Sequence, residues 1–289
     1  CCTLPFFRGE YMFSTLDTLG FELPYYGFMV GLGILACFLL IKLVTMKKRD
    51  HIEGIEYVCI GLAGGIGAFI MAHIVYAIAQ FDKLVYVLTH LDRVFGSLQM
   101  FMAYMIDVFG GMVFYGGLIG ACIGAFIYMK VAKLDVRSYA DTLAPCIPLF
   151  HAFGRIGCFL AGCCYGIESN FGVTYHHSLI VNANGVSRLP IQLFESVENV
   201  LICLVLLAVL CKCSSLKKGT LIWIYGLIYP VVRFINEFFR GDITERGYFG
   251  PLSTSQWISI FLFVISAVAL IAEYSRKPKQ NTAVNKEVA

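Results

Sequence analysis

Charged residues are scarce in this chain. They make up 14% of its 289 residues, whereas hydrophobic residues make up 58%. The mean hydropathy is +0.76, and a soluble domain of that composition would expose much of its apolar surface to water. The composition therefore excludes an ordinary soluble domain and predicts an all-α polytopic membrane protein. The net charge is only +3, so we expect no nucleic-acid partner.

The N-terminal segment lacks a basic flank followed by an apolar core. We therefore expect no cleavable signal peptide, and insertion is expected to depend on the first spanning helix.

Seven windows are apolar over roughly twenty residues, the length that crosses a hydrocarbon core of about 30 Å. They lie at 24–46, 55–79, 110–130, 141–163, 190–211, 219–239 and 255–274. The segment 86–106 is also apolar, but His90, Asp92 and Arg93 interrupt it. We expect one or two helices at the membrane surface there, between the second and third spans.

The placement of Lys and Arg predicts the orientation of these spans, because basic residues gather on the cytoplasmic side. With the N-terminus outside, the cytoplasmic side collects Lys42, Lys47, Lys48, Arg49, Lys130, Lys133, Arg137, Lys212, Lys217, Lys218, Arg276, Lys277, Lys279 and Lys286. The outer side keeps Arg8, Lys83, Arg93, Arg188, Arg240 and Arg246. We therefore expect an extracellular segment 1–23, a seven-helix domain 24–274 and a cytoplasmic tail 275–289. The segment 167–189 would form a small extracellular cap after the fourth span, although a simple spacer loop explains it equally well.

Two arginines, Arg155 and Arg233, stand inside hydrophobic stretches. A guanidinium in hydrocarbon costs at least about 2.5–3.5 kcal/mol, so it persists where it faces a cavity, a partner or an anion. At about 1.5 Å per residue, both arginines lie about 10 Å below the outer ends of their spans. The two side chains can therefore share one site.

Other polar side chains are expected in the same outer layer. They are Tyr26, Tyr76, Tyr115, Gln192, Glu195 and Glu237. Asp141 falls near the inner face instead, where helix N-capping after Ser138 is as good an explanation as a role in the site. The many glycines of the second and third spans are best explained by close helix packing.

The acidic members of this layer have a simple structural explanation. Glu237 can neutralise Arg233 as an i,i+4 partner, and Glu195 can neutralise Arg155. Arg240 would then leave the layer with spare positive charge. Arginine recognises phosphate through its planar fork of donors, so we expect a phosphate guest, supplied in this setting by phospholipid headgroups.

The residues around Arg155 form a glycine-framed motif. The motif consists of Gly154, Arg155, Ile156, Gly157, Gly162 and Gly166, and it resembles the signature of the phosphatidylglycerol–prolipoprotein diacylglyceryl transferases. Further matching positions are Tyr25, Tyr26, Gly27, Gly116, Gly117, Leu118, Ile119, Gly120, Asp141, Pro145, Pro190, Gln192, Leu193, Glu195, Tyr229, Arg233, Glu237, Phe238, Phe239, Arg240 and Leu252 to Gln256. The similarity runs in order from about residue 24 to about 272.

The resemblance implies transfer of diacylglycerol from phosphatidylglycerol to the thiol of a lipobox cysteine, which forms a thioether and releases glycerol phosphate. It implies a bacterial cytoplasmic membrane protein whose site faces the outer leaflet and needs no metal or cofactor. The implied catalytic residues are Arg155, Arg233, Glu237 and Tyr115. The implied substrate-binding residues are Tyr26, Gly116, Gly117, Gly154, Gln192, Glu195, Tyr229 and Arg240. Glu237 or Glu195 could accept the thiol proton, directly or through water.

Several positions depart from the family pattern. Tyr115 replaces a histidine often proposed to act in proton transfer, Phe69 replaces a common arginine, and Cys158, Ala161 and Cys163 replace two asparagines and a glutamate of the signature. A tyrosine with a pKa near 10 is a poor base at neutral pH. Three interpretations stay open: a rewired site, a different substrate, or weak or absent activity, as in a lipid-binding or transport relative.

Cysteine is abundant, with 12 residues, and Cys158, Cys163 and Cys164 cluster near the outer end of the fourth span. An oxidising exterior would permit a disulfide from Cys158 to Cys163 or Cys164, since adjacent cysteines rarely bond each other, and thiol redox chemistry is a second functional hypothesis. A Cys/His metal site that adds His176 and His177 is a weaker alternative. Cys1 and Cys2 raise the idea of a lipidated N-terminus, which these two residues alone do not support.

Overall fold

The computed structural model describes residues 15–18, 21–48, 54–111, 113–176, 178, 180–213, 216–242 and 247–275. The chain divides into two compact units, one formed by Cys1–Val44 and Arg137–Ala289 and the other by Thr45–Val136. Cys1, Cys2, His177, Arg246 and the expected tail beyond Ser275 lie outside the described residues.

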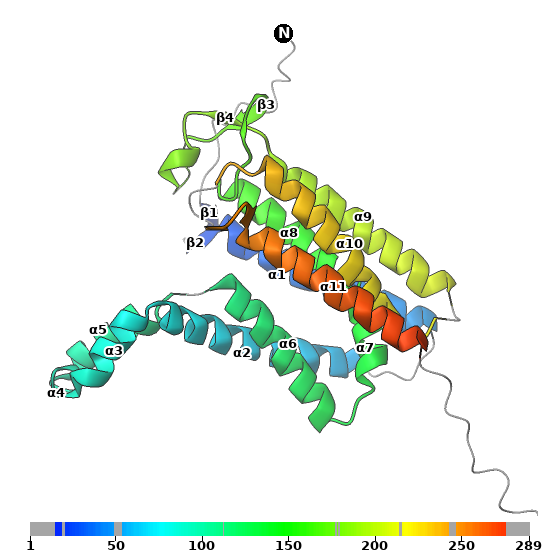
Figure 1. The fold of residues 1–289 in the computed structure, drawn as a ribbon, viewed down its shortest axis with the longest axis horizontal. Coiled ribbons are helices and arrows are strands. Elements are labelled where there is room, and N and C mark those ends of the chain that lie inside the picture. The colour runs from blue at the N-terminus through cyan, green and yellow to red at the C-terminus, as the bar shows by residue number, and fades with distance from the viewer. Residues whose placement is uncertain are drawn as a thin grey trace, which may run out of the picture. The chain divides into compact units, whose positions relative to one another are not determined.

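The first unit is a bundle of long helices (Figure 1). Its helices are α1 (Tyr25–Lys48, which runs on past the unit boundary), α7 (Val136–Leu143), α8 (Cys146–Leu160), α9 (Ile191–Lys212), α10 (Thr220–Asn236) and α11 (Thr254–Ser275). In this bundle α8 packs on α9, α9 on α10, and α10 on α11. Helix α1 approaches α8 closely at Gly33, where a Cβ atom would lie 3.1 Å from the side chains of Phe150 and Phe153.

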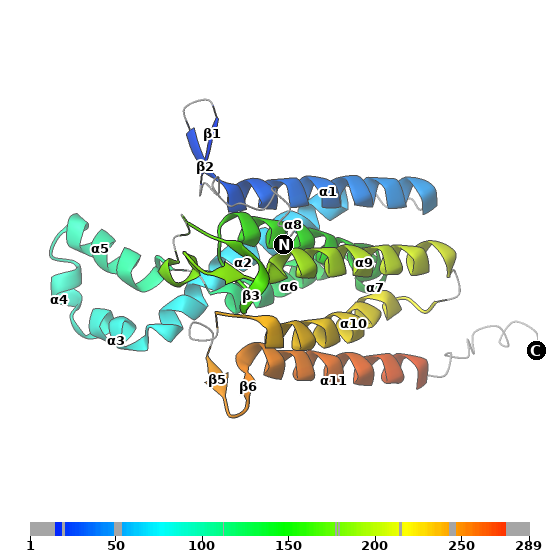
Figure 2. The same ribbon diagram turned by 90° about the horizontal axis from the view of Figure 1, so that it is seen from above.

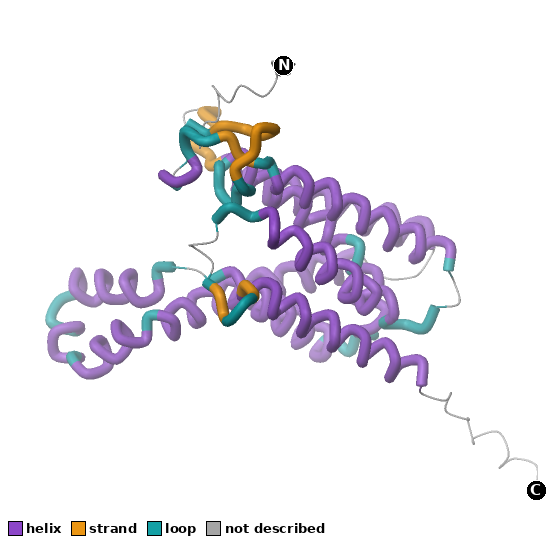
Figure 3. The backbone as a smooth tube through the Cα atoms, turned by 45° about the horizontal axis from the view of Figure 1, so that its top comes forward, coloured by secondary structure: helices purple, strands orange, loops and turns teal. Residues whose placement is uncertain are grey.

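Three short antiparallel ribbons lie at one end of this bundle (Figures 2 and 3). They pair β1 (Thr15–Thr18) with β2 (Phe21–Pro24), β3 (Glu168–Thr174) with β4 (Ser187–Arg188), and β5 (Tyr248–Phe249) with β6 (Leu252–Ser253). A short 3-10 helix, η2 (Val181–Ala183), joins β3 to β4. The expected cap after the fourth span is therefore a small ordered lobe, with a buried cluster of Tyr165, Tyr175 and Ala183.

The expected fourth span, 141–163, has different boundaries from those predicted. The chain is helical from Val136, breaks at Ala144 and Pro145, and continues as α8 from Cys146 to Leu160. The break is expected at proline, because it lacks an N–H and restricts the residue before it. The other spans of this unit agree with their expected bounds to within about three residues, and α10 is continued by the 3-10 turn η3 (Glu237–Phe239).

Asp141 caps the start of α10 rather than the start of its own helix, α7. Its Oδ2 accepts a hydrogen bond from the backbone N–H of Gly219 (2.6 Å), and its Oδ1 accepts from Leu221 (2.8 Å) and Ile222 (3.2 Å). These are the unpaired donors of the first turn of α10. Asp141 therefore fixes the end of α10 that is opposite to Arg233.

The second unit is built on two helices, α2 (Gly54–Ala79) and α6 (Phe114–Val131). Glycines let the backbones touch: a Cβ at Gly120 would lie 2.1 Å from the carbonyl oxygen of Gly67, and one at Gly116 would lie 2.7 Å from that of Met71. Close packing is thus confirmed as the role of these glycines. At Gly61 and Gly65 no described atom lies within 4 Å of a Cβ position.

Between α2 and α6 the chain forms three short helices, α3 (Phe81–Thr89), α4 (Leu91–Val94) and α5 (Leu98–Phe109). They share a small core with the end of α2, made of Ala77, Val87, Val94 and Val108. The sequence predicted one or two helices in a shorter segment, so the helical insertion is larger than expected. His73 of α2 is a hydrogen-bonded side chain, with Nδ1 2.9 Å from the carbonyl oxygen of Gly111.

Six of the described helical segments are long and apolar enough to cross a membrane. They are Tyr25–Met46, Gly54–Ala79, Val136–Leu160, Ile191–Lys212, Thr220–Phe239 and Thr254–Ser275. The window predicted at 110–130 begins later, because Gly110 ends α5 and α6 starts at Phe114. The apolar part of α6, Tyr115–Val131, is shorter than each of the six segments above. The protein is a helical polytopic membrane protein.

Candidate active site

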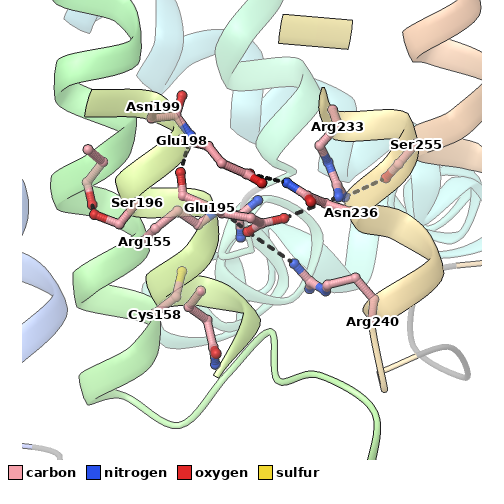
Figure 4. A network of polar contacts seen from close by, with 12 residues as sticks. Arg155, Cys158, Glu195, Ser196, Glu198, Asn199, Arg233, Asn236, Arg240 and Ser255 are labelled. Atoms are coloured by element: carbon pink, nitrogen blue, oxygen red, sulfur yellow. Dashed lines mark hydrogen bonds and ion pairs between the residues drawn. The ribbon is translucent and has the colours of Figure 1, made fainter. Parts of the chain in front are cut away.

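The first unit brings three arginines to one carboxylate, that of Glu195 (Figure 4). Glu195 Oε2 lies 2.7 Å from Nε of Arg155 and 3.8 Å from Nη1 of Arg240, and its Oε1 lies 3.4 Å from Nη1 of Arg233. The Glu195 side chain is 3% exposed, and those of Arg155 and Arg233 are 11% and 13% exposed. The prediction that Arg155 and Arg233 can share one site is confirmed.

Glu195 belongs to a polar stripe along α9. Gln192, Glu195, Ser196 and Asn199 recur at the three- and four-residue spacing that places side chains on one helix face, and all four are buried. Ser196 donates to the carbonyl oxygen of Ala152 in α8 (3.0 Å), and Asn199 donates to the carbonyl oxygen of Glu195 (2.7 Å). The stripe therefore holds α9 on α8 beside Arg155.

Arg233 is held by groups from three segments. Besides Glu195, its Nη2 lies 2.8 Å from Oε2 of Glu237 and donates to the hydroxyl oxygen of Ser255 (3.2 Å). Glu237 is thus the i,i+4 ion-pair partner that the sequence suggested. Ser255 is placed by a capping box at the start of α11, in which Ser253 and Gln256 exchange hydrogen bonds of 3.0 and 3.2 Å.

Arg240 does not supply spare positive charge, contrary to the sequence-based expectation. Asp242 accepts two hydrogen bonds from it, from Nε (3.0 Å) and Nη2 (2.6 Å), and both side chains are buried. Burial opposes the charged form of Arg240, but the hydrogen bond to Asp242, together with the negative charges of Cys164, Asp242 and Glu195, outweighs burial and raises the pKa of Arg240. The described site therefore balances three arginines with three carboxylates, those of Glu195, Glu237 and Asp242.

The turn after α8 has the hydrogen bonds of a Schellman motif. The N–H of Gly162 donates to the carbonyl oxygen of Phe159, and that of Cys163 donates to the carbonyl oxygen of Cys158, both at 3.1 Å. Gly162 has φ +68, a left-handed conformation that glycine adopts without strain. The motif ends α8 three residues before the predicted end of that span. It also brings residues five apart in sequence next to each other.

Gly166 is clamped between two other segments. Its N–H donates to the carbonyl oxygen of Leu189 (3.1 Å), and the next residue, Ile167, donates to that of Phe239 (3.0 Å). A Cβ atom at Gly166 would lie 2.4 Å from the Leu189 oxygen, closer than side chains tolerate. Only glycine fits here, and the clamp ties the turn after α8 to the segment that carries Arg240.

Gly166→Ala is expected to destabilise the protein by about 1–3 kcal/mol, because the added methyl group must displace backbone atoms. Thermal unfolding of the purified protein in detergent measures the effect. Gly31→Ala is the matched control, since a Cβ there meets no described atom within 4 Å, and we expect its Tm to be unchanged. An unchanged Tm for Gly166→Ala would contradict the clamp.

The three cysteines of this turn are free thiols that meet at one point. The sulfur atoms of Cys158, Cys163 and Cys164 all lie within 4.8 Å of one another. Hydrogen bonds from the Cys158 and Cys163 thiols, together with the positive charges of Arg240 and Arg155, lower the pKa of Cys164. Hydrogen bonding within the cluster raises the pKa of Cys163. His176 does not belong to the cluster, and His177 lies outside the described residues.

Gln192 connects the site to the cap. It is fully buried, and its Nε2 donates to the carbonyl oxygen of Cys163 (2.7 Å) and to the hydroxyl oxygen of Tyr175 (3.2 Å). Burial raises the pKa of Tyr175 to about 12, so this phenol stays protonated at neutral pH. Gln192 thus holds the turn after α8 in place.

Three further predicted residues of the first unit lie on α8 or against it. Tyr26 packs on Gly157, where a Cβ atom would lie 3.0 Å from its ring. Tyr229 stacks on Tyr225, with ring centroids 5.5 Å apart, and its ring centroid lies 5.4 Å from that of His151. At Gly154, next to Arg155, no described atom lies within 4 Å of a Cβ position.

The remaining predicted site residues belong to the second unit. Tyr115, Gly116 and Gly117 lie at the start of α6, and Phe69 lies on α2, where its ring meets His73 edge-on at 4.5 Å. Tyr115 is half-buried. Its part in catalysis stays a prediction.

Sequence reasoning missed three residues of the site. Asp242 holds Arg240, Ser255 holds Arg233, and Asn199 extends the α9 stripe. Asn199 could have been found, because it lies four residues after Glu195 and so on the same face. Ser255 was part of a matched motif without an assigned role. Asp242 carried no signal beyond its closeness to Arg240 in sequence.

This arrangement can stabilise an anion inside an apolar bundle. Three fixed cations whose partners are also fixed form a preorganised site, and its charges need little reorganisation when negative charge develops nearby. The site contains carboxylates that can accept a proton within ion-pair distance of the same arginines.

Comparisons with known proteins identify the family. The model of the prolipoprotein diacylglyceryl transferase family matches residues 14–272. A phosphatidylglycerol–prolipoprotein diacylglyceryl transferase of Clostridium tetani is 33% identical over 266 residues, which cover 90% of this chain and 97% of the relative. One from Clostridium perfringens is 34% identical over 256 residues, covering 86% and 90%. One from Helicobacter pylori is 30% identical over 272 residues, covering 91% and 93%. The chain belongs to the prolipoprotein diacylglyceryl transferase family.

Proposed function

We propose that this protein transfers the diacylglyceryl group of phosphatidylglycerol to the lipobox cysteine thiol of a prolipoprotein. The thiol sulfur forms a bond to the terminal glyceryl carbon of the lipid. The bond from that carbon to the phosphate oxygen breaks, and glycerol phosphate leaves with the electron pair. Family membership supports this reaction, and the convergence of Arg155, Arg233 and Arg240 on buried Glu195 is the observation that carries it.

Arg155 and Arg233 would hold the phosphate. Charge develops on the phosphate oxygen as the carbon–oxygen bond breaks, and fixed cations lower that barrier. The phosphate would compete with Glu195 for the two guanidinium groups, which are the least buried of the three arginines. We propose that the phosphate approaches at Gly154, where no described atom lies within 4 Å of a Cβ position.

A carboxylate would accept the thiol proton, directly or through water. Glu195 and Glu237 both lie within ion-pair distance of Arg233, and both are buried. We propose that Tyr115 positions the substrate or relays a proton. No metal or cofactor takes part in this scheme.

The topology we propose has seven spans, with α6 as the third. Its N-terminus is outside and its C-terminus is cytoplasmic. The basic residues of the expected inner loops support this orientation, and α3 to α5 would lie at the membrane surface. The ribbon end of the first unit, where the site lies, would then face the outer leaflet of a bacterial cytoplasmic membrane, and the cap would meet the acceptor peptide.

Two other activities remain to be separated from transfer. The substitutions at Tyr115, Phe69, Cys158, Ala161 and Cys163 are compatible with a relative that binds or moves lipid without chemistry. The thiol cluster is compatible with redox chemistry.

The deciding experiment incubates purified protein with phosphatidylglycerol labelled in its acyl chains and a lipobox peptide. We expect label on the peptide cysteine, lost in Arg233→Ala and kept in the triple variant Cys158→Ser, Cys163→Ser, Cys164→Ser. If the protein bound the lipid but transferred no label, the result would support a relative that binds or moves lipid without chemistry. If the triple cysteine variant lost label transfer and Arg233→Ala kept it, the result would support thiol redox chemistry as the function.

A further inference from the structure

The thiols of Cys158, Cys163 and Cys164 lie together at the turn after α8, a position where an apolar contact is usual. In a Schellman motif the residues at either end of the last turn usually make a hydrophobic contact. Here those residues are Cys158 and Cys163, and the N–H of Cys163 donates to the carbonyl oxygen of Cys158 at 3.1 Å. Cys164 then adopts φ +60, which turns the chain back at a residue that is not glycine. One turn of backbone therefore supplies three converging sulfur atoms.

The size of the cluster suits one thiophilic metal ion. Zinc–thiolate bonds are about 2.3 Å long, so two sulfurs at tetrahedral positions on one ion are about 3.8 Å apart. All three sulfur atoms lie within 4.8 Å of one another, and small side-chain rotations would close the difference. A disulfide would use two of the thiols and leave the third unexplained.

The surrounding charge also suits such an ion. Three thiolates around a divalent cation carry a net charge of −1, which nearby guanidinium groups help to stabilise even when each is also paired with a carboxylate. The guanidinium groups of Arg155 and Arg240 lie close enough to Cys164 to interact with it electrostatically. Because Arg155 is three residues before Cys158 on α8, it lies on a neighbouring part of the same helix surface.

The cluster differs from the other cysteines of the described chain. No other group of three metal-ligating side chains of this kind occurs among the residues described. Cys203, for comparison, is a buried thiol of α9 packed in the bundle. Cys163 and Cys164 are partly exposed, which gives an ion a route to the site, while buried Cys158 closes its inner side.

We propose that Cys158, Cys163 and Cys164 form a binding site for a thiophilic divalent cation of the zinc class. The three thiols bind as thiolates and release their protons to solvent, and no oxidant is needed. Soft thiolate ligands select such ions over magnesium or calcium. With three protein ligands, a fourth position remains for water or another small ligand. The three ligands are distinct from the residues proposed to transfer the lipid, and Arg155 lies near both groups.

The test uses the full chain in detergent, reduced and freed of metal under anaerobic conditions. Cd²⁺ is titrated in, and the thiolate-to-cadmium charge-transfer absorption in the ultraviolet is followed. We expect saturation at one ion per chain, with Zn²⁺ competing for it. Cys158→Ser, Cys163→Ser and Cys164→Ser should each weaken the absorption and the affinity. Cys203→Ser and His176→Ala should leave both unchanged.

Two results would overturn the proposal. One is the absence of the absorption in fully reduced protein. The other is an absorption that the three serine variants leave unchanged. Diacylglyceryl transfer is measured separately on the same samples, so a failure of the proposed transfer reaction leaves the metal titration interpretable, and a failed titration says nothing against transfer.

Discussion

Arg155→Ala is expected to lower kcat/KM for diacylglyceryl transfer by about 10²–10³-fold, the loss typical of removing one preorganised donor from a developing anion. Arg155 contacts Glu195 through Nε, its side chain is 11% exposed, and no described atom lies within 4 Å of a Cβ position at neighbouring Gly154. It is therefore placed to meet a phosphate that arrives from the lipid. Initial rates of label transfer to a lipobox peptide measure the effect.

Two companion variants sharpen that result. Arg155→Lys keeps the charge but loses the planar fork of donors, so we expect an intermediate rate. Arg137→Ala removes an arginine of α7 that pairs with Glu273 at 2.8 Å and is half-exposed, and it should leave the rate near that of the wild type. Equal rates for Arg155→Ala and the wild type would exclude a role for Arg155 in holding the phosphate.

Glu195→Gln is expected to cost the largest amount of stability, about 3–5 kcal/mol, because removal of one partner leaves buried charges without compensation. Glu195 is the one described carboxylate within 4 Å of all three arginines, at 2.7, 3.4 and 3.8 Å. Denaturant unfolding in detergent, compared with the wild type, measures the loss. Glu198→Gln is the matched control: it is one turn away on α9 and contacts Asn236 rather than an arginine, so its loss should be much smaller.

A double-mutant cycle measures the coupling free energy between Arg155 and Glu195 separately from their other contacts. Arg155→Ala combined with Glu195→Gln removes a cation and an anion together, so the combined loss should be smaller than the sum by about 0.5–3 kcal/mol. Strict additivity would show that the 2.7 Å contact does not couple the two residues. Equal losses for Glu195→Gln and Glu198→Gln would contradict the central position of Glu195.

The arginine pair could be predicted from sequence because its signal is local. A charge inside an apolar run is visible without a structure, and helix rise is constant enough to place Arg155 and Arg233 in one layer. The partners Glu195 and Glu237 followed from the same spacing. The neutral charge of the site could not be predicted in this way. Arg240 is balanced by Asp242, which lies beyond the end of the helix, where helical spacing no longer applies.

The turn geometry could not be predicted either. A spacing of five between Cys158 and Cys163 does not resemble a usual pair of metal ligands, and it becomes meaningful only when Gly162 ends α8 in a Schellman motif. Asp141 is a similar case, since a capping residue was expected but its partner helix, α10, is 78 residues away in sequence. Apolar length indicated where the helices are, while Pro145 decided where α8 begins and Gly162 decided where it ends.

Diacylglyceryl transfer is tested most directly by measuring two products in one reaction of wild-type protein with phosphatidylglycerol and a lipobox peptide. The two products are glycerol phosphate and the thioether-linked peptide. We predict equal amounts of the two products, both absent when the peptide cysteine is replaced by serine. Glycerol phosphate formed without thioether, or neither product despite bound lipid, would contradict it.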